Sequence, residues 1–477
     1  MDQMEVLMLA GKTVSLSGAP RVTLGYIART FLWIGLASFS LAALGEAKKW
    51  VTKKRRWFTD DEYLQGLGLA QLLPGAPTVN LSSYLGFRLR GLPGAAAATI
   101  FFLIPSFLLM LLLSHLYLKY GELPVVSGLF RGLGALVVGL VFNTILNLWQ
   151  SAVKTTFNWL LAAVGFASVF WLKMGIIQIL LIAGGASLVV FLLTRRFPAL
   201  ARWTGGWSGL WKKGAASAGD PNNGAAAEKT PARAAAGQTS LNQASSEGVR
   251  KWWRAKGQQS APVPDSDYVS VCSQAPLPLS LRKIAMLAVW LSLFLAADLL
   301  LIHRRPELMQ LGGSFLRIGA LVFGSGYAML PFIQDTVVNQ FHWLTNQQFA
   351  IALALSLITP GPVTIIGTFI GYKIAGVVGA IVGMVNMYFP AWAITTLVAA
   401  PYAKAGRVGS VRQVIGGIVA AFIGTLVVVL IKLSVDTLVD YSTVGMAAGA
   451  FIIQRFAKID TVWIVLGGAL VSLAVFH

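Results

Sequence analysis

The stretch Leu73-Pro74-Gly75-Ala76-Pro77-Thr78 returns later in the chain as Thr359-Pro360-Gly361-Pro362-Val363-Thr364. Each copy places two prolines and a glycine between apolar runs of helical length. Proline lacks the backbone N–H that a helix needs, and glycine tolerates a left-handed backbone, so a helix must break at both places. Both stretches therefore predict a pair of half-helices.

The composition around these stretches is that of a membrane-spanning protein. Hydrophobic residues make up 56% of the 477 positions and charged residues 12%, which is far outside the range of soluble chains of this length. Apolar runs cover most of the chain except a window near its middle, and a helix needs about 20 such residues to cross the hydrocarbon. The runs lack the short alternation of barrel strands. We therefore predict an all-α polytopic membrane protein.

Landmark residues recur in the same order in the second half of the chain. The matches are Phe31 with Phe315, Gly35 with Gly319, Trp57 with Trp343, Pro74 with Pro360, Pro77 with Pro362, Arg88 with Lys373, Pro105 with Pro390 and Gly139 with Gly424. Ala76 has no counterpart. This order indicates a duplication, and hence two homologous halves.

The residue composition along the sequence divides the chain into five segments. The window from 194 to 283 is basic and rich in Ala, Gly, Ser, Gln and Pro, which favours a flexible tether over a lipid-binding element built around Arg250, Lys251 and Trp252. The predicted segments are an N-terminal tail (1–29), a first repeat (30–193), the linker (194–283), a connecting transmembrane helix (284–302) and a second repeat (312–477).

Loop charges indicate that the two halves have opposite orientations. Residues 48–56 hold six Lys or Arg, whereas their counterpart, residues 334–348, holds none. The next pair of loops reverses this bias, because residues 119–127 hold one basic residue and residues 401–412 hold three. Cytoplasmic loops carry the excess of Lys and Arg, so we predict an inverted repeat with broken or re-entrant helices.

Inverted repeats with breaks at matching positions are typical of secondary transporters whose site lies between the halves. A half-helix that begins inside the protein aims unpaired N–H groups at one spot, which suits an anion. The alternative is that both breaks serve only helix packing. On the first interpretation, the substrate-binding candidates are Gly75, Pro77, Thr78, Asn80, Gly361, Pro362 and Thr364.

Two further groups are weaker candidates for the same site. The short first segment of each half contributes small and polar residues, namely Ser38, Ser40, Gly324, Ser325, Gly326 and Tyr327; close helix packing explains the same composition. Arg88 and Lys373, at equivalent positions, could attract an oxyanion, whereas basic side chains at helix ends also extend to lipid headgroups.

Several functions are disfavoured by what the sequence contains. Cys272 is the single cysteine and the four histidines are scattered, so we predict no metal site, no cofactor and no catalytic residues. The net charge of +20 fits cytoplasmic loops that hold the chain's orientation better than a nucleic-acid partner. We expect membrane lipid as a partner; a homodimer is compatible with the sequence.

The chain resembles the chromate ion transporter family, whose members carry two homologous membrane halves. The resemblance is carried by Arg55-Arg56-Trp57, Leu72-Leu73-Pro74-Gly75, Phe323-Gly324-Ser325-Gly326-Tyr327 and Thr359-Pro360-Gly361-Pro362. It implies export of chromate, with sulfate as a further oxyanion, and chromate resistance. The alternatives are uptake of sulfate or another small anion, and an anion channel. We expect a plasma or inner membrane location.

Overall fold

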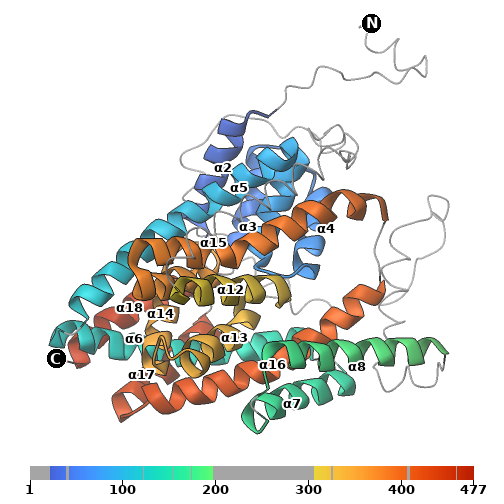
Figure 1. Ribbon diagram of the computed structural model, residues 1–477. Coiled ribbons are helices and arrows are strands. Elements are labelled where there is room, and N and C mark those ends of the chain that lie inside the picture. The colour runs from blue at the N-terminus through green and yellow to red at the C-terminus, as the bar shows by residue number, and fades with distance from the viewer. Residues whose placement is uncertain are drawn as a thin grey trace, which may run out of the picture. The chain divides into compact units, whose positions relative to one another are not determined.

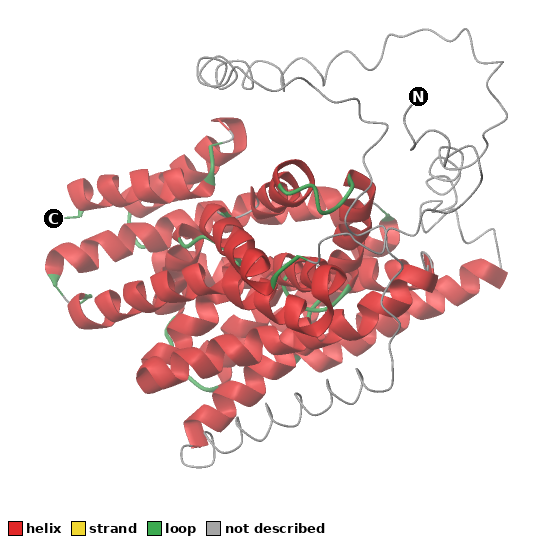
Figure 2. Cartoon of the chain, turned by 90° about the horizontal axis from the view of Figure 1, so that it is seen from above, coloured by secondary structure: helices red, strands yellow, loops and turns green. Residues whose placement is uncertain are grey.

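A computed structural model of the 477-residue chain describes residues 22–38, 42–121, 123–153, 155–172, 174–196, 306–323, 326–405, 409–457 and 459–476. These residues are almost entirely helical and form no β-strand within the described ranges (Figures 1 and 2). Most of the predicted tail and linker, and all of the predicted connecting helix at 284–302, lie outside the described residues.

The helices of the first half follow the apolar runs of the sequence. They are α2 (Leu24–Ala37), α3 (Ala42–Lys48), a π-helical turn (Lys49–Lys54), α4 (Asp60–Leu72), α5 (Pro77–Tyr120), α6 (Pro124–Ala152), α7 (Thr156–Phe170) and α8 (Ile176–Arg196).

The second half repeats this order with short turns inserted around its breaks. Its elements are α12 (Pro306–Leu321), a 3-10 turn (Gly326–Met329), α13 (Leu330–Gln334), a π-helical turn (Asp335–Gln340), α14 (Asn346–Ile358), a 3-10 turn (Val363–Ile365), α15 (Ile366–Ala405), α16 (Gly409–Thr437), α17 (Tyr441–Ile452), a π-helical turn (Ile453–Ala457) and α18 (Thr461–Val475).

Helix α5 folds back on itself as a helical hairpin. Its backbone leaves the helical region at Arg90 and Gly91, where Gly91 has a φ of 67°. The two arms lie close together, because the hydroxyls of Ser83 and Thr99 are 2.7 Å apart and a Cβ on Gly86 would lie 2.3 Å from the carbonyl oxygen of Gly94. The second arm carries the long apolar run, and the first arm is the half-helix that follows the break.

Helix α15 makes the same hairpin at the equivalent place. It turns at Ala375 and Gly376, and a Cβ on Gly371 would lie 2.0 Å from the carbonyl oxygen of Gly379. Only glycine permits such an approach of two helix backbones. The two halves are therefore built alike, with a short helix, a broken pair of half-helices and then a long helix in each.

The two halves exchange helix contacts, because the helix that follows the hairpin in each half, α6 or α16, packs on the last two helices of the other half. Helix α6 lies against α17 and α18, and α16 lies against α7 and α8 (Figure 1). Equivalent glycines make the contacts: a Cβ on Gly139 would lie 2.1 Å from the oxygen of Ala447, and one on Gly424 would lie 1.9 Å from the oxygen of Ala162. This exchange of helix pairs was not predicted from the sequence.

The equivalent helices α6 and α16 run in opposite directions where they meet. Gly134, in the N-terminal half of α6, has Thr437, the last residue of α16, as its nearest neighbour outside its own helix. An axis that relates two antiparallel copies is perpendicular to the helices, which is the geometry of an inverted repeat. The predicted fold class is thus confirmed: two homologous, broken-helix halves of an all-α membrane protein.

Four helices among the described residues are long and apolar enough to cross a membrane, namely Pro77–Tyr120, Val126–Gln150, Val363–Ala399 and Val414–Thr437. The first helix of each half is shorter, with 14 residues in α2 and 16 in α12. Both therefore end inside the protein, where the two breaks are.

Candidate functional site

The first break, residues 73–77, separates α4 from α5. Leu73 leaves the helix with an extended backbone, Gly75 takes a φ of 99°, and Pro77 occupies the first turn of α5. Proline fits there because the first N–H groups of a helix have no intrahelical partner. The predicted pair of half-helices is thus present in the first half.

The second break, residues 359–362, has the same construction. Thr359 is extended, Gly361 has a φ of 116°, and Pro362 precedes the 3-10 turn that leads into α15. All four residues are buried, whereas Leu73 and Pro77 of the first break are partly exposed. The two breaks therefore share a positive-φ glycine after an extended residue, but they differ in accessibility and in the type of helix that follows.

Each break is held by the end of the first helix of the opposite half. The N–H of Gly75 donates to the carbonyl oxygen of Val322, at 2.9 Å, and the N–H of Gly361 donates to that of Ser38, at 2.5 Å. Val322 and Ser38 are equivalent residues of the repeat, and Pro74 also pairs with Phe323 in an isolated antiparallel bridge. Four chain segments from both halves therefore converge on one region.

Glycine is required at both breaks by close contacts as well as by φ. A Cβ on Gly75 would lie 2.5 Å from the Cβ of Ala391, and one on Gly361 would lie 2.0 Å from the hydroxyl oxygen of Ser106. Ala391 and Ser106 are again equivalent residues, on the second arms of α15 and α5. Each break thus packs on the long arm of the other half.

The helices that start at the breaks have no side-chain caps. Neither Ala76, which precedes α5, nor Pro362, which precedes the 3-10 turn, offers a side-chain acceptor to the first amides. By contrast, α4 and α14 begin with capping boxes, formed by Thr59 with Glu62 and by Thr345 with Gln348. The amide-bearing helix ends inside the protein are therefore the ones available to an anion.

The structure brings most of the predicted residues to this region. Some of their side chains are already hydrogen-bonded within the protein. The hydroxyls of Thr364 and Tyr388 are 2.9 Å apart, and the Ser38 hydroxyl donates to its own helix at Ile34. Thr78 is partly exposed beside Pro77. Gly326 is close to Thr364, because a Cβ on it would lie 3.7 Å from the threonine methyl.

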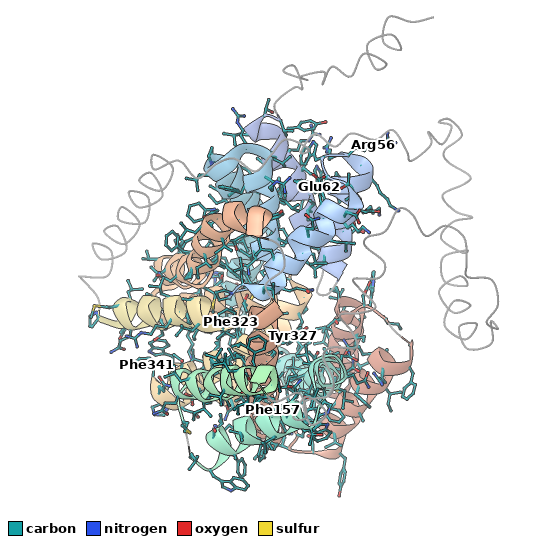
Figure 3. The ribbon with its side chains drawn as sticks, turned by 90° about the vertical axis from the view of Figure 1, so that its right-hand side faces the viewer. Arg56, Glu62, Phe157, Phe323, Tyr327 and Phe341 are labelled. Atoms are coloured by element: carbon teal, nitrogen blue, oxygen red, sulfur yellow. The ribbon has the colours of Figure 1, made fainter. Side chains whose placement is uncertain are left out.

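The remaining candidates from the first segments of the two halves are Tyr327, which the structure describes, and three residues that it does not. Tyr327 follows Gly326 in the same 3-10 turn and is half-buried. Figure 3 shows Phe323 and Tyr327 in the same part of the molecule. Ser40, Gly324 and Ser325 lie outside the described residues, so their assignment stays a prediction.

Asn80 is fully buried and uses its amide on backbone carbonyls. Its Nδ2 donates to the oxygens of Ala70, at 3.1 Å, and of Pro74, at 3.0 Å, with a longer contact of 3.4 Å to Leu73. Its Oδ1 has no hydrogen-bond partner. This side chain therefore holds the carbonyl end of α4 as well as lying at the first break.

Arg88 and Lys373 lie at the far ends of the half-helices, not at the breaks. The Arg88 guanidinium is 3.6 Å from Glu62 and donates to the hydroxyl of Tyr84, while Lys373 donates to the side chain of Gln348. Eleven residues of helix separate each from its break, or about 16 Å. Figure 3 likewise shows Glu62 well apart from Phe323 and Tyr327.

Lys373 also lines an open groove at the start of α14. Its other walls include the polar side chains of His342, Thr345, Asn346 and Asp436. Asp436 there accepts a hydrogen bond from Asn346, at 2.6 Å. Lys373 could therefore act on an ion near this groove, but it does not reach the region where the breaks meet.

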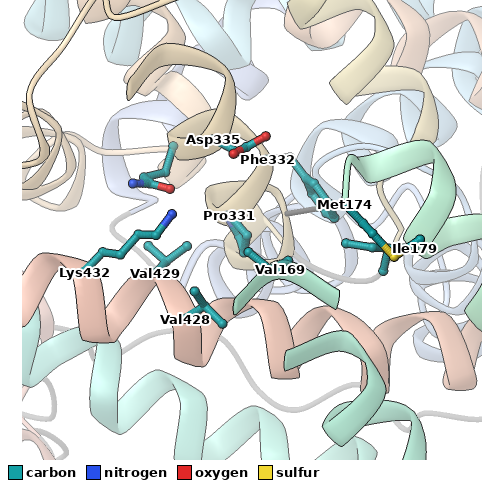
Figure 4. Close-up of a pocket in the computed structure, with 10 residues that line it drawn as sticks. Val169, Met174, Ile179, Pro331, Phe332, Asp335, Val428, Val429 and Lys432 are labelled. Atoms are coloured by element: carbon teal, nitrogen blue, oxygen red, sulfur yellow. The ribbon is translucent and has the colours of Figure 1, made fainter. Parts of the chain in front are cut away.

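A second pocket lies between α7, α13 and α16 and is mostly apolar (Figure 4). Phe332, Val428 and Met174 are among its lining residues, with Asp335 and Lys432 as the charged ones. It contains no residue of either break. The lining residues do not favour an anion-binding site over a simple packing gap between the halves.

Sequence reasoning missed Ser106, which donates a hydrogen bond to the carbonyl oxygen of Pro360 in the second break. The available signal was a lone serine after Pro105 within the apolar run from Ile100 to Leu113. The sequence also gives no indication of the partner of Arg131. Its guanidinium forms a 2.6 Å ion pair with Asp440, at the start of α17.

Comparison with known proteins gives consistent results. A family model described as "Chromate transporter" matches residues 25–189 and again residues 309–473. The chain is 29% identical to the chromate transport protein of Cupriavidus metallidurans, over 97% of this chain and 96% of that protein. It is 28% identical to the probable chromate transport protein of Synechococcus elongatus, over 90% of each. No solved structure matches the chain.

Proposed function

The chain belongs to the chromate transporter family, and from this premise we propose that it is a secondary transporter that exports chromate and so confers chromate resistance. Sulfate and related oxyanions are the further substrates in this proposal. The protein is integral to a membrane, and we place it in the plasma or inner membrane.

One observation carries the proposal: two uncapped helix starts from inverted halves converge at the breaks. Amides at a helix start carry a partial positive charge, which attracts an anion without any basic side chain. Among the described residues, no Lys or Arg side chain forms a hydrogen bond or ion pair with either break. The backbone is therefore the proposed recognition element.

The proposed binding residues follow from this arrangement. The N–H groups of Gly75 and Gly361 are bonded to Val322 and Ser38, so the backbone amides that face the ion in this proposal are those that follow them, up to Thr78 and Thr364. The hydroxyls of Thr78, Ser38 and Tyr327 are the proposed side-chain contacts. Ser40, Gly324 and Ser325 complete the set on the grounds of sequence. Arg88 and Lys373 act at longer range, from the far ends of the half-helices.

The direction of transport is proposed from energetics. Moving one charge across 100 mV is worth about 2.3 kcal/mol, so a dianion that leaves an inside-negative compartment gains roughly 4.6 kcal/mol, on the order of a thousandfold gradient. Uptake would need about three co-transported cations to reverse this sign. The described breaks contain no acidic side chain that could hold them.

The test is efflux of labelled chromate from proteoliposomes under an imposed potential. An inside-negative potential is expected to speed efflux, and rates are expected to saturate with chromate concentration. Acceleration by the opposite potential would contradict export, and flux that does not saturate would favour an anion channel. Competition by sulfate and molybdate then defines the substrate range and tests the alternative of sulfate uptake.

A further inference from the structure

A broken helix presents two opposite charges at one place. The last carbonyls of the first half-helix are negative and the first amides of the next are positive. Transporters that bind cations leave the carbonyls of unwound segments open to the ion. Which of the two sets is covered therefore decides which ion a break attracts.

At the first break the carbonyl end is covered by one side chain. Asn80 donates to the oxygens of Ala70 and Pro74. Ala70 is in the last turn of α4 and Pro74 follows it, so both carbonyls belong to the negative end of this half-helix. The amide nitrogen of Asn80 thus neutralises the negative end of α4.

At the second break the equivalent carbonyls are covered by other side chains. The hydroxyl of Thr359 donates to Ser356, the counterpart of Ala70, at 2.8 Å. The hydroxyl of Ser106, from the opposite half, donates to Pro360, the counterpart of Pro74. The same two carbonyls are therefore closed at both breaks.

The donors are not related by the repeat. Asn80 corresponds to Ile365, Ser106 to Ala391, and Thr359 to Leu73; none of these three counterparts has a side-chain donor. Burial alone requires partners for buried backbone groups. It would require them equally for the amides at the starts of the next helices, which have no side-chain cap. Burial therefore does not explain why the carbonyl ends of α4 and α14 have side-chain partners while the amide starts of the next helices have none.

We propose that Asn80, Thr359 and Ser106 are specificity-determining positioning residues, which make the breaks selective for anions by covering the carbonyl ends of α4 and α14. This inference rests on the proposed function and names the part of the site that sets the sign of the accepted charge. The three residues act through the backbone, and the ion itself meets the amides.

The decisive variant is Asn80→Asp, assayed for chromate transport in proteoliposomes across pH. An ionised carboxylate accepts but does not donate, so it opens the carbonyls and adds a negative charge beside Gly75. We expect the KM for chromate to rise about tenfold or more over wild type at pH 8, with a smaller change in kcat. At pH 5.5 the protonated acid donates again, and the ratio to wild type at the same pH should shrink.

Asn158→Asp is the matched control. Asn158 is also buried and donates from Nδ2 to a helix-end carbonyl, that of Ala152, at 2.7 Å, but it lies in α7 away from both breaks. Its substitution should lower stability similarly and leave the KM ratio near one at both pH values. Thr359→Val, which keeps the shape and removes the donor, should raise the KM about threefold or more without pH dependence.

The outcomes separate this inference from the function on which it rests. Chromate transport by wild type with an unchanged KM in both Asn80→Asp and Thr359→Val overturns the inference alone. A KM ratio for Asn80→Asp that matches Asn158→Asp overturns it as well. If folded wild type moves no chromate, the proposed function fails and the inference fails with it. If Asn80→Asp does not fold, Thr359→Val decides.

Discussion

Ser106 of the first half donates a hydrogen bond from its hydroxyl to the carbonyl oxygen of Pro360 in the second, across 254 positions of sequence. Both residues are buried. The bond joins the long arm of α5 to the second break, so the shape of that break depends on the other half of the protein.

Ser106→Ala should destabilise the protein by about 1–3 kcal/mol, because it leaves the carbonyl of Pro360 buried without this donor. Thermal unfolding in detergent measures the effect. Ser114→Ala is the control on the same helix, since the buried Ser114 hydroxyl donates only to Met110 of its own helix, at 2.6 Å. Equal losses in the two variants would show that the bond across the halves has no special role.

Gly361→Ala should abolish transport and cost at least about 2 kcal/mol of stability, because a φ of 116° is strained for any residue with a Cβ. The new methyl would also meet Ser106. Gly68→Ala in α4 is the comparison, since a Cβ there meets nothing within 4 Å. Wild-type flux in Gly361→Ala would contradict the requirement for glycine at the break.

The ion pair between Arg131 and Asp440 is a contact between the halves that we expect to weaken at acidic pH. The N–H and hydroxyl of Thr443 and the charge of Arg131 lower the pKa of the Asp440 carboxyl. A lowered pKa in the folded state contributes stability above the unfolded value of about 3.9, and this contribution is lost as pH falls through the folded value. The unfolding temperature should therefore drop on acidification from pH 6 to below pH 4.

Asp440→Asn tests this contribution, because asparagine also caps a helix but does not titrate. The variant should show a smaller drop in unfolding temperature than wild type over the same pH range. Identical pH profiles of the two proteins would mean that other carboxyl groups account for the whole effect.

Lys373→Gln should raise the KM for chromate about threefold at low salt, because Lys373 lines an open groove and is hydrogen-bonded to the neutral Gln348. The difference should diminish at 0.5 M salt, where exposed charges are screened. Arg88→Gln should change the KM less than twofold, since Glu62 already offsets that charge. Transport rates measured at increasing chromate concentration, on each side of the vesicle in turn, give the KM of both variants.

The sequence was sufficient to predict the halves, their inversion and the breaks, because those features follow from residues with strong local effects. Pro74, Gly75, Pro360 and Gly361 allow few backbone paths in an apolar chain, and the opposite charge bias of equivalent loops indicates the inversion. Asn80 and Thr364 lie near the breaks by their position in the sequence, and their role in binding stays a prediction. The direction of their polar atoms depends on neighbours distant in sequence, such as Tyr388.

The exchange of helix pairs between the halves could not be predicted in this way. Gly132 and Gly139 show that some helix approaches α6 closely, but a small residue does not identify its partner. The same holds for Ser106, whose acceptor is in the other half. Arg131 corresponds to Gly416 and Asp440 corresponds to Thr155, so the symmetry of the repeat could not predict this ion pair.

The exchanged packing makes a final prediction about assembly. If the chain is cut at a protease site inserted after residue 230, in the linker predicted from sequence, the two fragments should stay together and transport should persist, because α6 and α16 each pack on helices of the other fragment. Gly424→Val should separate the cut fragments, since its side chain would meet the backbone of Ala162. Gly445→Val, with nothing within 4 Å of its Cβ, should leave them associated. Size-exclusion chromatography after cleavage distinguishes these results, and fragments of wild type that separate in mild detergent would contradict the interlocked arrangement.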